Sequence, residues 1–186
     1  KLLIYSFSES RRVGLLLSIA RLFRPLLPAQ LKKRIPLVVN TADAHPRTQA
    51  RSMLLLDGCV QPAAAPHINK LAIQVFDRLG IQLRTIAESG CCGALQHHLA
   101  DSEGARHRAR SNIDAWWPVV EQGAEAIVVT ATGCTPMVKD YRHLLRDDEQ
   151  YVERAKRISA MTKDLSEVLS REDLSELSPN TSKRVA

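Results

Sequence analysis

The sequence lacks the short motifs that mark several common cofactor sites. It contains no Cys-x-x-Cys pair, which structural zinc sites usually show, and no Gly-x-Gly-x-x-Gly fingerprint of a dinucleotide-binding domain. Carboxylate and histidine residues do not pair at a spacing that suggests acid–base catalysis. These absences exclude a standard dinucleotide site and argue against zinc knuckles.

Aromatic residues and long apolar runs are also scarce. Phe, Trp and Tyr make up 4% of the chain, so the net charge of +6 has no aromatic platform beside it and does not indicate nucleic-acid binding. The most apolar stretch, residues 13–27, is interrupted by arginines. It also falls short of the roughly 20 apolar residues that a membrane-spanning helix needs.

Cysteine is present but sparse, with four residues among 186. A disulfide scaffold would be smaller and denser in cysteine, so we expect reduced thiols in a cytoplasmic protein. The composition, 45% hydrophobic and 25% charged, is typical of a globular domain with one core. No cleavable signal is visible, and the chain opens at Lys1 inside an apolar run, so we expect a piece of a longer protein.

Residues 1–50 are predicted to form an amphipathic helix followed by a linker. The helix is expected over residues 13–27, and its apolar face has to dock on the rest of the protein, on a partner subunit or on the membrane surface. Only Glu9 and Asp43 oppose the many basic residues of this region, which suits a solvated helix face or a contact with anionic lipid or an acidic partner. The face consists of four residues, Leu15, Ile19, Leu22 and Leu26.

Residues 51–186 show the alternation of strands and helices that is typical of an α/β fold. Such an order predicts a parallel sheet whose strands are joined by helical crossovers, with further helices at both ends of the chain. Strands are expected at 53–56, 81–87 and 126–130, and helices at 68–79, 105–120, 137–145, 151–160 and 162–170.

Every cysteine has a glycine neighbour and follows one of the three predicted strands. The three segments are Gly58-Cys59, Gly90-Cys91-Cys92-Gly93 and Gly133-Cys134. Glycine lets the backbone adopt positive φ and approach a bulky group closely. Because the carboxyl ends of parallel strands meet at one edge of the sheet, we expect the four thiols to converge there.

Several kinds of chemistry fit four convergent thiols. An iron–sulfur cluster usually takes four cysteine thiolates, and a structural zinc ion also takes four ligands. Alternatively, Cys91 and Cys92 form a vicinal disulfide, or one of them acts as a low-pKa nucleophile. Purely structural buried thiols are a further alternative. His97, His98, Lys139 and Tyr141 are secondary candidates as ligands, proton carriers or groups that neutralise cluster charge.

The segments around the cysteines resemble the cysteine-rich CCG domain of heterodisulfide reductase and its relatives. Longer segments resemble the glycolate oxidase iron–sulfur subunit, and the similarity runs from about residue 13 to the end of the chain. The chain would then follow the N-terminal ferredoxin-like module of such a subunit and precede its second CCG segment. The segments that carry the resemblance are 56–62, 75–81, 90–94, 112–118 and 138–141.

The resemblance implies an electron-transfer role. In such enzymes a flavin-containing subunit oxidises glycolate to glyoxylate, and the iron–sulfur subunit passes the electrons toward the quinone pool. This chain would be a subunit of an oxidoreductase that does not bind the substrate and is inactive alone. The complex would lie in the cytoplasm or peripherally at the inner membrane.

The sequence departs from the CCG pattern at one position. Domains that bind the non-cubane cluster of heterodisulfide reductase end in Gly-Cys-x-x-Cys, whereas Met137 stands here in place of the fifth cysteine. A thioether is a weak iron ligand. Two alternatives remain: a cofactor-free interaction domain, or one [4Fe-4S] cluster held by Cys59, Cys91, Cys92 and Cys134.

Overall fold

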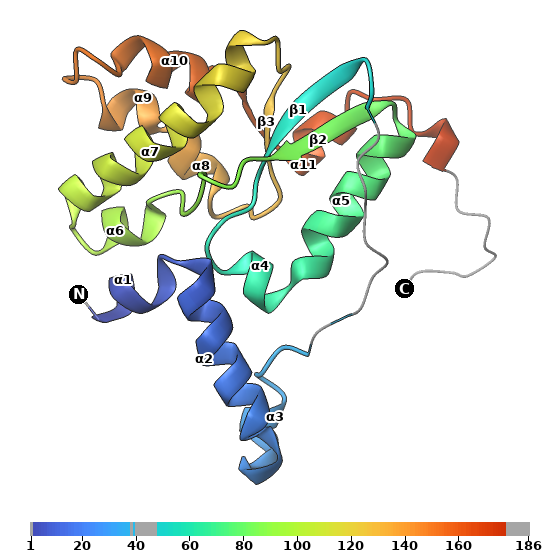
Figure 1. Cartoon of the computed structure of the whole chain (residues 1–186), viewed down its shortest axis with the longest axis vertical. Helices are drawn as coiled ribbons and strands as arrows, with labels where there is room; N and C mark the ends of the chain where they lie inside the picture. Colours follow the sequence, from blue (N-terminus) through green and yellow to red (C-terminus); the bar gives the residue numbers. More distant parts are fainter. Residues whose placement is uncertain (1, 38, 40–47, 178–186) are drawn as a thin grey trace.

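The computed structural model describes residues 2–37, 39 and 48–177 (Figure 1). Its centre is a sheet with the strand order β2-β1-β3-β4. Every neighbouring pair of strands is parallel, which confirms the predicted α/β class. The strands are β1 (Arg51–Leu56), β2 (Ile81–Thr85), β3 (Ile127–Val129) and β4 (Thr162–Asp164).

Helices cover both faces of this sheet and extend the chain at its N-terminus (Figure 1). The N-terminal helices are α1 (Leu2–Phe7), α2 (Ser10–Leu22), the 3-10 turn η1 (Arg24–Leu26) and α3 (Ala29–Lys32). The next ones are α4 (Gln61–Ala64), α5 (Pro66–Arg78), α6 (Ala94–His98) and α7 (Ser102–Glu121). The last ones are α8 (Thr135–Lys139), α9 (Tyr141–Leu144), α10 (Val152–Met161), α11 (Leu165–Leu169) and η2 (Ser175–Leu177).

The core explains why β1 is a continuous apolar run instead of an alternating one. Leu54 and Leu56 face one cluster, with side chains of α7, α8 and α10. Met53 and Leu55 face a second cluster, with side chains of α5 and α11. A parallel strand covered on both faces needs apolar residues at every position. The helices that contribute to the two clusters lie on the two sides of the sheet in Figure 1.

Several predicted boundaries were wrong. Residues 162–164 form β4 instead of the start of a helix. The sequence did not predict this strand, because three residues are too few to show a periodic pattern. The predicted helix 137–145 is divided into α8 and α9, and the strand expected over 81–87 ends at Thr85. The helix expected over 13–27 ends at Leu22, ahead of the 3-10 turn that contains Pro25. Of the linker predicted over residues 35–50, residues 38 and 40–47 lie outside the described residues.

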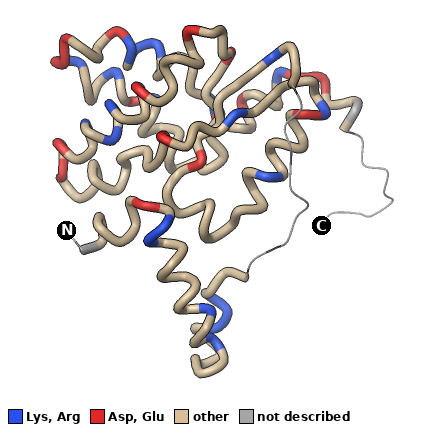
Figure 2. The backbone as a smooth tube through the Cα atoms, in the orientation of Figure 1, with Lys and Arg blue, Asp and Glu red and all other residues tan. Residues whose placement is uncertain are grey.

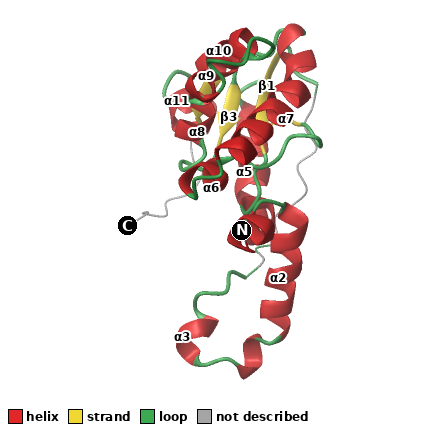
Figure 3. Cartoon of the chain, turned by 90° about the vertical axis from the view of Figure 1, so that its left-hand side faces the viewer, coloured by secondary structure: helices red, strands yellow, loops and turns green. Residues whose placement is uncertain are grey.

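Residues 10–37, which we call the N-terminal arm, project from the α/β body as a helical hairpin (Figure 3). Helix α2 packs on α4, and the Arg21 side chain donates from Nε to the carbonyl of Pro36 and from Nη2 to that of Ala63, at 3.0 and 3.1 Å. Arg24 likewise donates to the carbonyl of Lys32 at 3.3 Å. The hairpin is thus closed by arginine contacts to backbone carbonyls.

The predicted apolar face of α2 is exposed. Leu22 and Leu26 are 74% and 81% exposed, and Val13 is the buried residue of α2. The described part of this chain therefore does not cover this face. A partner subunit and the membrane surface remain as docking alternatives. Among the described residues, no helix has the length and hydropathy needed to cross a membrane.

Candidate metal centre

The four cysteines lie just past the C-terminal ends of three neighbouring strands. Cys59 follows β1 in the turn that leads to α4, and Cys91 and Cys92 lie between β2 and α6. Cys134 follows β3 and occupies the N-cap position of α8. The sequence predicted this placement correctly, because the strand ends can be recognised from the apolar runs before each cysteine.

The four thiols form a connected row. Cys59 and Cys91, Cys91 and Cys92, and Cys92 and Cys134 lie close enough for each thiol to shift the pKa of its neighbour. All four thiols are free, so Cys91 and Cys92 do not form a vicinal disulfide here. Cys91 and Cys92 are buried, whereas Cys59 and Cys134 are half-buried. The residues at the two ends of the row are therefore partly exposed.

The contacts shift the pKa values of neighbouring thiols in opposite directions. The hydrogen bond from Cys59 lowers the pKa of Cys91, and the hydrogen bond from Cys92 lowers the pKa of Cys134. The same bonds, together with burial, raise the pKa of Cys59 and of Cys92. Negative charge is thus favoured on Cys91 and Cys134 relative to Cys59 and Cys92. Thiolates are the form in which cysteine binds metals.

The backbone of the Gly-Cys-Cys-Gly segment adds donors to these sulfurs. The N–H of Gly93 donates to Cys91 and the N–H of Ala94 donates to Cys92, and each bond lowers the pKa of the thiol that receives it. Gly93 has φ of 90°, and a Cβ atom there would lie 3.3 Å from the carbonyl oxygen of Ala105. Gly58 also has positive φ. The other two flanking glycines have no positive φ, so the expected role of glycine holds at two of its four positions.

Two buried polar residues, Asn112 on α7 and Tyr141 on α9, form hydrogen bonds with the backbone of the same segment. Asn112 on α7 accepts from the N–H of Gly90 at 2.9 Å and donates to the carbonyl of Cys91 at 3.0 Å. Tyr141 on α9 donates to the carbonyl of Cys92 at 2.9 Å. Sequence reasoning missed Asn112, although an asparagine on the buried face between Ala109 and Ile113 was a signal.

The secondary candidates have other surroundings. Lys139 is paired with Glu167 at 2.7 Å. His97 and His98 are exposed and line a separate cleft beside Met137. Met137 itself is buried in the core cluster that includes Cys92.

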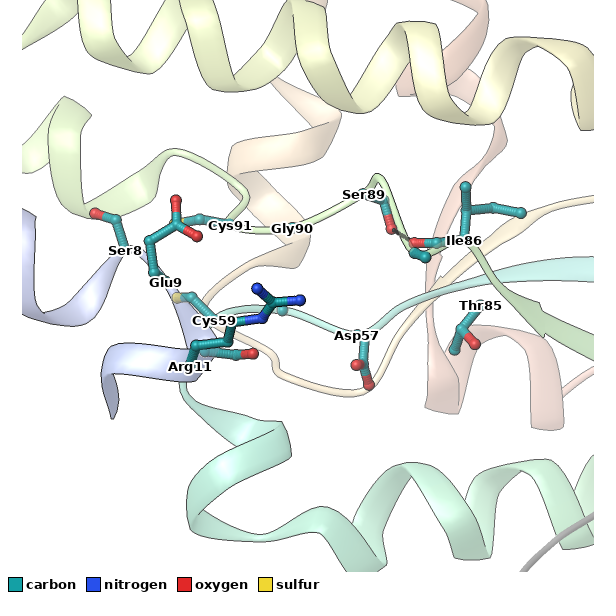
Figure 4. Close-up of a pocket in the computed structure, with 13 residues that line it drawn as sticks. Ser8, Glu9, Arg11, Asp57, Cys59, Thr85, Ile86, Ser89, Gly90 and Cys91 are labelled. Carbon is teal, nitrogen blue, oxygen red and sulfur yellow. Dashed lines mark hydrogen bonds between the residues drawn. The ribbon is translucent and has the colours of Figure 1, made fainter. Parts of the chain in front are cut away.

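The α1–α2 junction closes the open side of the site. Ser8 and Gln96 are both 3% exposed, and Gln96 Nε2 donates to Ser8 Oγ at 3.0 Å. Gln96 Oε1 lies 3.9 Å from Cys91 Sγ, within reach of a protonated Cys91. Ser8 lines a cleft of about 340 Å³ that Cys59 and Cys91 also line (Figure 4). The N-terminal segment therefore forms one wall of the cysteine site.

The donor set fits a group larger than a single ion. Among the residues that the structure describes, no three His, Cys, Asp or Glu side chains converge on a point that could hold one metal ion. A four-iron cluster takes one thiolate at each iron, so its ligands surround a group instead of meeting at a point. Four adjacent thiols, with backbone N–H groups donating to Cys91 and Cys92, could supply one thiolate to each iron of such a cluster.

Comparisons with known proteins agree with the resemblance seen in the motifs. Over 183 residues, which are 97% of this chain and 43% of the relative, the chain is 42% identical to the "Glycolate oxidase iron-sulfur subunit" of Escherichia coli (strain K12). It is 28% identical over 119 residues, 64% of the chain and 26% of the relative, to the "Probable glycolate oxidase iron-sulfur subunit" of Bacillus subtilis (strain 168).

A third relative carries a different name. The chain is 23% identical over 111 residues, 60% of the chain and 44% of the relative, to "Lactate utilization protein A" of Bacillus cytotoxicus. The chain thus spans less than half the length of each of these relatives. Residues 53–139 match the family described as "CCG: Cysteine-rich domain". This segment therefore belongs to the CCG cysteine-rich domain family, and the predicted resemblance to glycolate oxidase iron–sulfur subunits is confirmed.

Proposed function

We propose that this chain is the electron-transferring CCG part of an iron–sulfur subunit in a glycolate-oxidising enzyme. The observation that carries the proposal is the row of four free thiols at one edge of the parallel sheet. A [4Fe-4S] cluster bound there would supply one-electron transfer. Its proposed ligands are Cys59, Cys91, Cys92 and Cys134.

The protein groups around the row support this role electrostatically. A thiolate-ligated cluster carries negative charge, which needs donors and cations nearby when it lies away from water. The N–H groups of Gly93 and Ala94 point at the buried sulfurs, and the positive charge of Arg108 further lowers the pKa of Cys91. Arg108 is held in place by Glu9, at 2.7 Å.

The proposed partners are those that the resemblance to glycolate oxidase iron–sulfur subunits implies. A flavin-containing subunit oxidises glycolate to glyoxylate and passes the electrons to this subunit, which delivers them toward the quinone pool. The absence of a dinucleotide fingerprint in this chain is consistent with the flavin lying on another subunit. A ferredoxin-like module and a second CCG domain would belong to the same subunit, since the relatives are more than twice as long as the region matched.

A cofactor-free scaffold domain is the second candidate function. The observation that favours it is the position of Met137, which is buried in the core where the fifth cysteine of a non-cubane site would stand. In this alternative Cys91 and Cys92 are structural or redox-active thiols, and the domain assembles the flavin subunit with the ferredoxin-like module.

Electron transfer in the assembled enzyme separates the two functions. In the full-length subunit with its partner subunits, Cys91→Ser is expected to abolish glycolate-dependent quinone reduction while glycolate still reduces the flavin. Met137→Leu, which conserves volume and removes no proposed ligand, serves as the control and should retain activity. Unchanged quinone reduction in Cys91→Ser would leave the scaffold function as the better account.

We further propose that the N-terminal arm attaches the subunit to the anionic inner membrane. Residues 10–37 include seven Arg and Lys residues and no Asp or Glu, so the arm carries blue segments and no red ones in Figure 2. Leu22, Phe23 and Leu26 are exposed at the end of α2 and in η1. Exposed leucines beside Lys32, Lys33 and other cations match an interfacial helix better than a protein interface, where lysine is depleted.

Vesicle binding tests the arm. The chain is expected to sediment with anionic vesicles at low salt, more weakly at high salt, and not with neutral vesicles. The double variant Leu22→Ser/Leu26→Ser should lose binding, while Leu71→Ser, at an exposed position of α5, should keep it. If vesicles bind neither the wild-type chain nor the double variant, and the double variant instead fails to assemble with the flavin subunit, the arm docks on protein and the lipid proposal is wrong.

A further inference from the structure

A closed hydrogen-bond network fixes the orientation of the backbone that carries Cys91 and Cys92. Asn112 Nδ2 donates both to the Cys91 carbonyl, at 3.0 Å, and to the Tyr141 hydroxyl, at 2.9 Å. Asn112 Oδ1 accepts from Gly90 N–H, and the Tyr141 hydroxyl donates to the Cys92 carbonyl. Because both amide hydrogens and the amide oxygen are used, the amide of Asn112 has only one orientation that fits.

The burial of this network makes it expensive to disturb. Asn112 is 1% exposed and Tyr141 is 0% exposed. Burial, as the largest cause, holds the pKa of Tyr141 well above its usual value, so its hydroxyl keeps the proton that it donates. A buried carbonyl that loses its donor bears the full cost of desolvation, because water cannot replace the bond.

The network acts on the sulfurs through the peptide that joins Cys92 to Gly93. In a trans peptide the C=O and N–H groups point in opposite directions. Tyr141 draws the Cys92 carbonyl toward α9, and the N–H of Gly93 in the same peptide therefore points away from α9. This N–H is the group that donates to the sulfur of Cys91. Tyr141 thus binds the C=O group, and the Cys91 sulfur accepts from the N–H group, of the same Cys92–Gly93 peptide.

We infer that Asn112 and Tyr141 are positioning residues that aim the backbone N–H of Gly93 at the sulfur of Cys91. Such N–H···S bonds stabilise negative charge on the sulfur. Hydrogen bonds to the sulfurs are among the factors that set the reduction potential of an iron–sulfur cluster. Through the backbone that they hold, Asn112 and Tyr141 would thus tune the reduction potential of a cluster bound at this site.

Amide exchange in the metal-free chain tests the positioning role by itself. Tyr141→Phe keeps the buried ring and removes only the hydroxyl. Tyr151→Phe is the matched control, because the Tyr151 hydroxyl donates to Asp114 and not to the cysteine segment. By nuclear magnetic resonance, the Gly93 amide is expected to exchange about tenfold faster in Tyr141→Phe and at the wild-type rate in Tyr151→Phe. An unchanged Gly93 rate in Tyr141→Phe would overturn the inference.

The reduction potential tests the consequence for the cluster, and this second readout rests on the proposed function. After anaerobic loading of the chain with iron and sulfide, Tyr141→Phe is expected to lower the midpoint potential and to shift the iron–sulfur stretching bands, with Tyr151→Phe unchanged. A loaded Tyr141→Phe chain with wild-type potential and wild-type bands would contradict the inference and leave the cluster proposal intact. Failure of every variant to bind iron would contradict the cluster proposal, while the amide exchange would still decide the positioning role.

Discussion

Apolar side chains are covered on both sides of the sheet in the α/β body, whereas those of the N-terminal arm face outward. Leu54 and Leu55 on β1 are 0% exposed, while Leu26 in the arm is 81% exposed. The body closes around two apolar clusters, and the arm is closed by arginine contacts to backbone carbonyls. The comparison teaches that apolar periodicity predicts which residues share a face, and that the cover of that face depends on distant parts of the structure.

A matched pair of leucine truncations, one in the body and one in the arm, gives the largest expected difference in stability between the two regions. Leu54→Ala removes a fully buried side chain from the central strand and is expected to destabilise the chain by about 2–5 kcal/mol. Leu26→Ala removes an exposed side chain and should change the free energy of unfolding by less than about 0.5 kcal/mol. Denaturant unfolding measures both, and similar losses in the two variants would show that the arm packs more closely than the structure indicates.

The junction between the arm and the body gives the next largest expected effect. Ser8→Ala leaves Nε2 of the buried Gln96 without its acceptor, which is expected to cost about 1–3 kcal/mol. Limited proteolysis should then cut the N-terminal segment faster than in wild type. Ser18→Ala, at an exposed position of α2, is the control and should behave as wild type. Equal cleavage of all three proteins would mean that Ser8 does not fasten the arm.

A surface ion pair of the body gives the smallest expected effect and depends on pH. The hydrogen bond from Arg51, at 2.8 Å, lowers the pKa of Glu172. Because the folded pKa is depressed, the stabilisation is present above the unfolded pKa of about 4.3 and is lost as pH falls through the folded pKa.

Glu172→Gln is therefore expected to lose less than about 1 kcal/mol at pH 7, since Arg51 is half-exposed to solvent. The difference from wild type should shrink as the pH falls below about 4. Unfolding curves at the two pH values measure it. A difference that is constant with pH would show that the charge of Glu172 is not what stabilises the fold.

The body can be predicted from the sequence better than the arm for a physical reason. Strands β1, β2 and β3 have apolar runs with turns at their ends, and these local signals are sufficient to place the cysteines on one edge of the sheet. Strand β4 has three residues and its pairing with β3 is a tertiary property, so the sequence pattern does not reveal it. Exposure of the α2 face could not be predicted, because periodicity gives a face but not its partner.

The groups that hold the cysteine pair were harder to predict than the cysteines. Asn112 and Tyr141 are 29 residues apart and meet only after α7 and α9 pack. Tyr141 was expected to neutralise charge, whereas its buried hydroxyl holds a backbone carbonyl. Local patterns identify ligands by residue type, but the groups that orient those ligands are chosen by tertiary contacts.

Iron and sulfide analysis after anaerobic reconstitution tests the central claim most directly. The account predicts about four irons and about four sulfides per chain, with loss of both in Cys92→Ser. The Met137→Leu variant should load as wild type does. A wild-type chain that retains no iron and no sulfide after removal of excess reagents, or a Cys92→Ser variant that retains as much as wild type, would contradict the assignment of a cluster to this row of thiols.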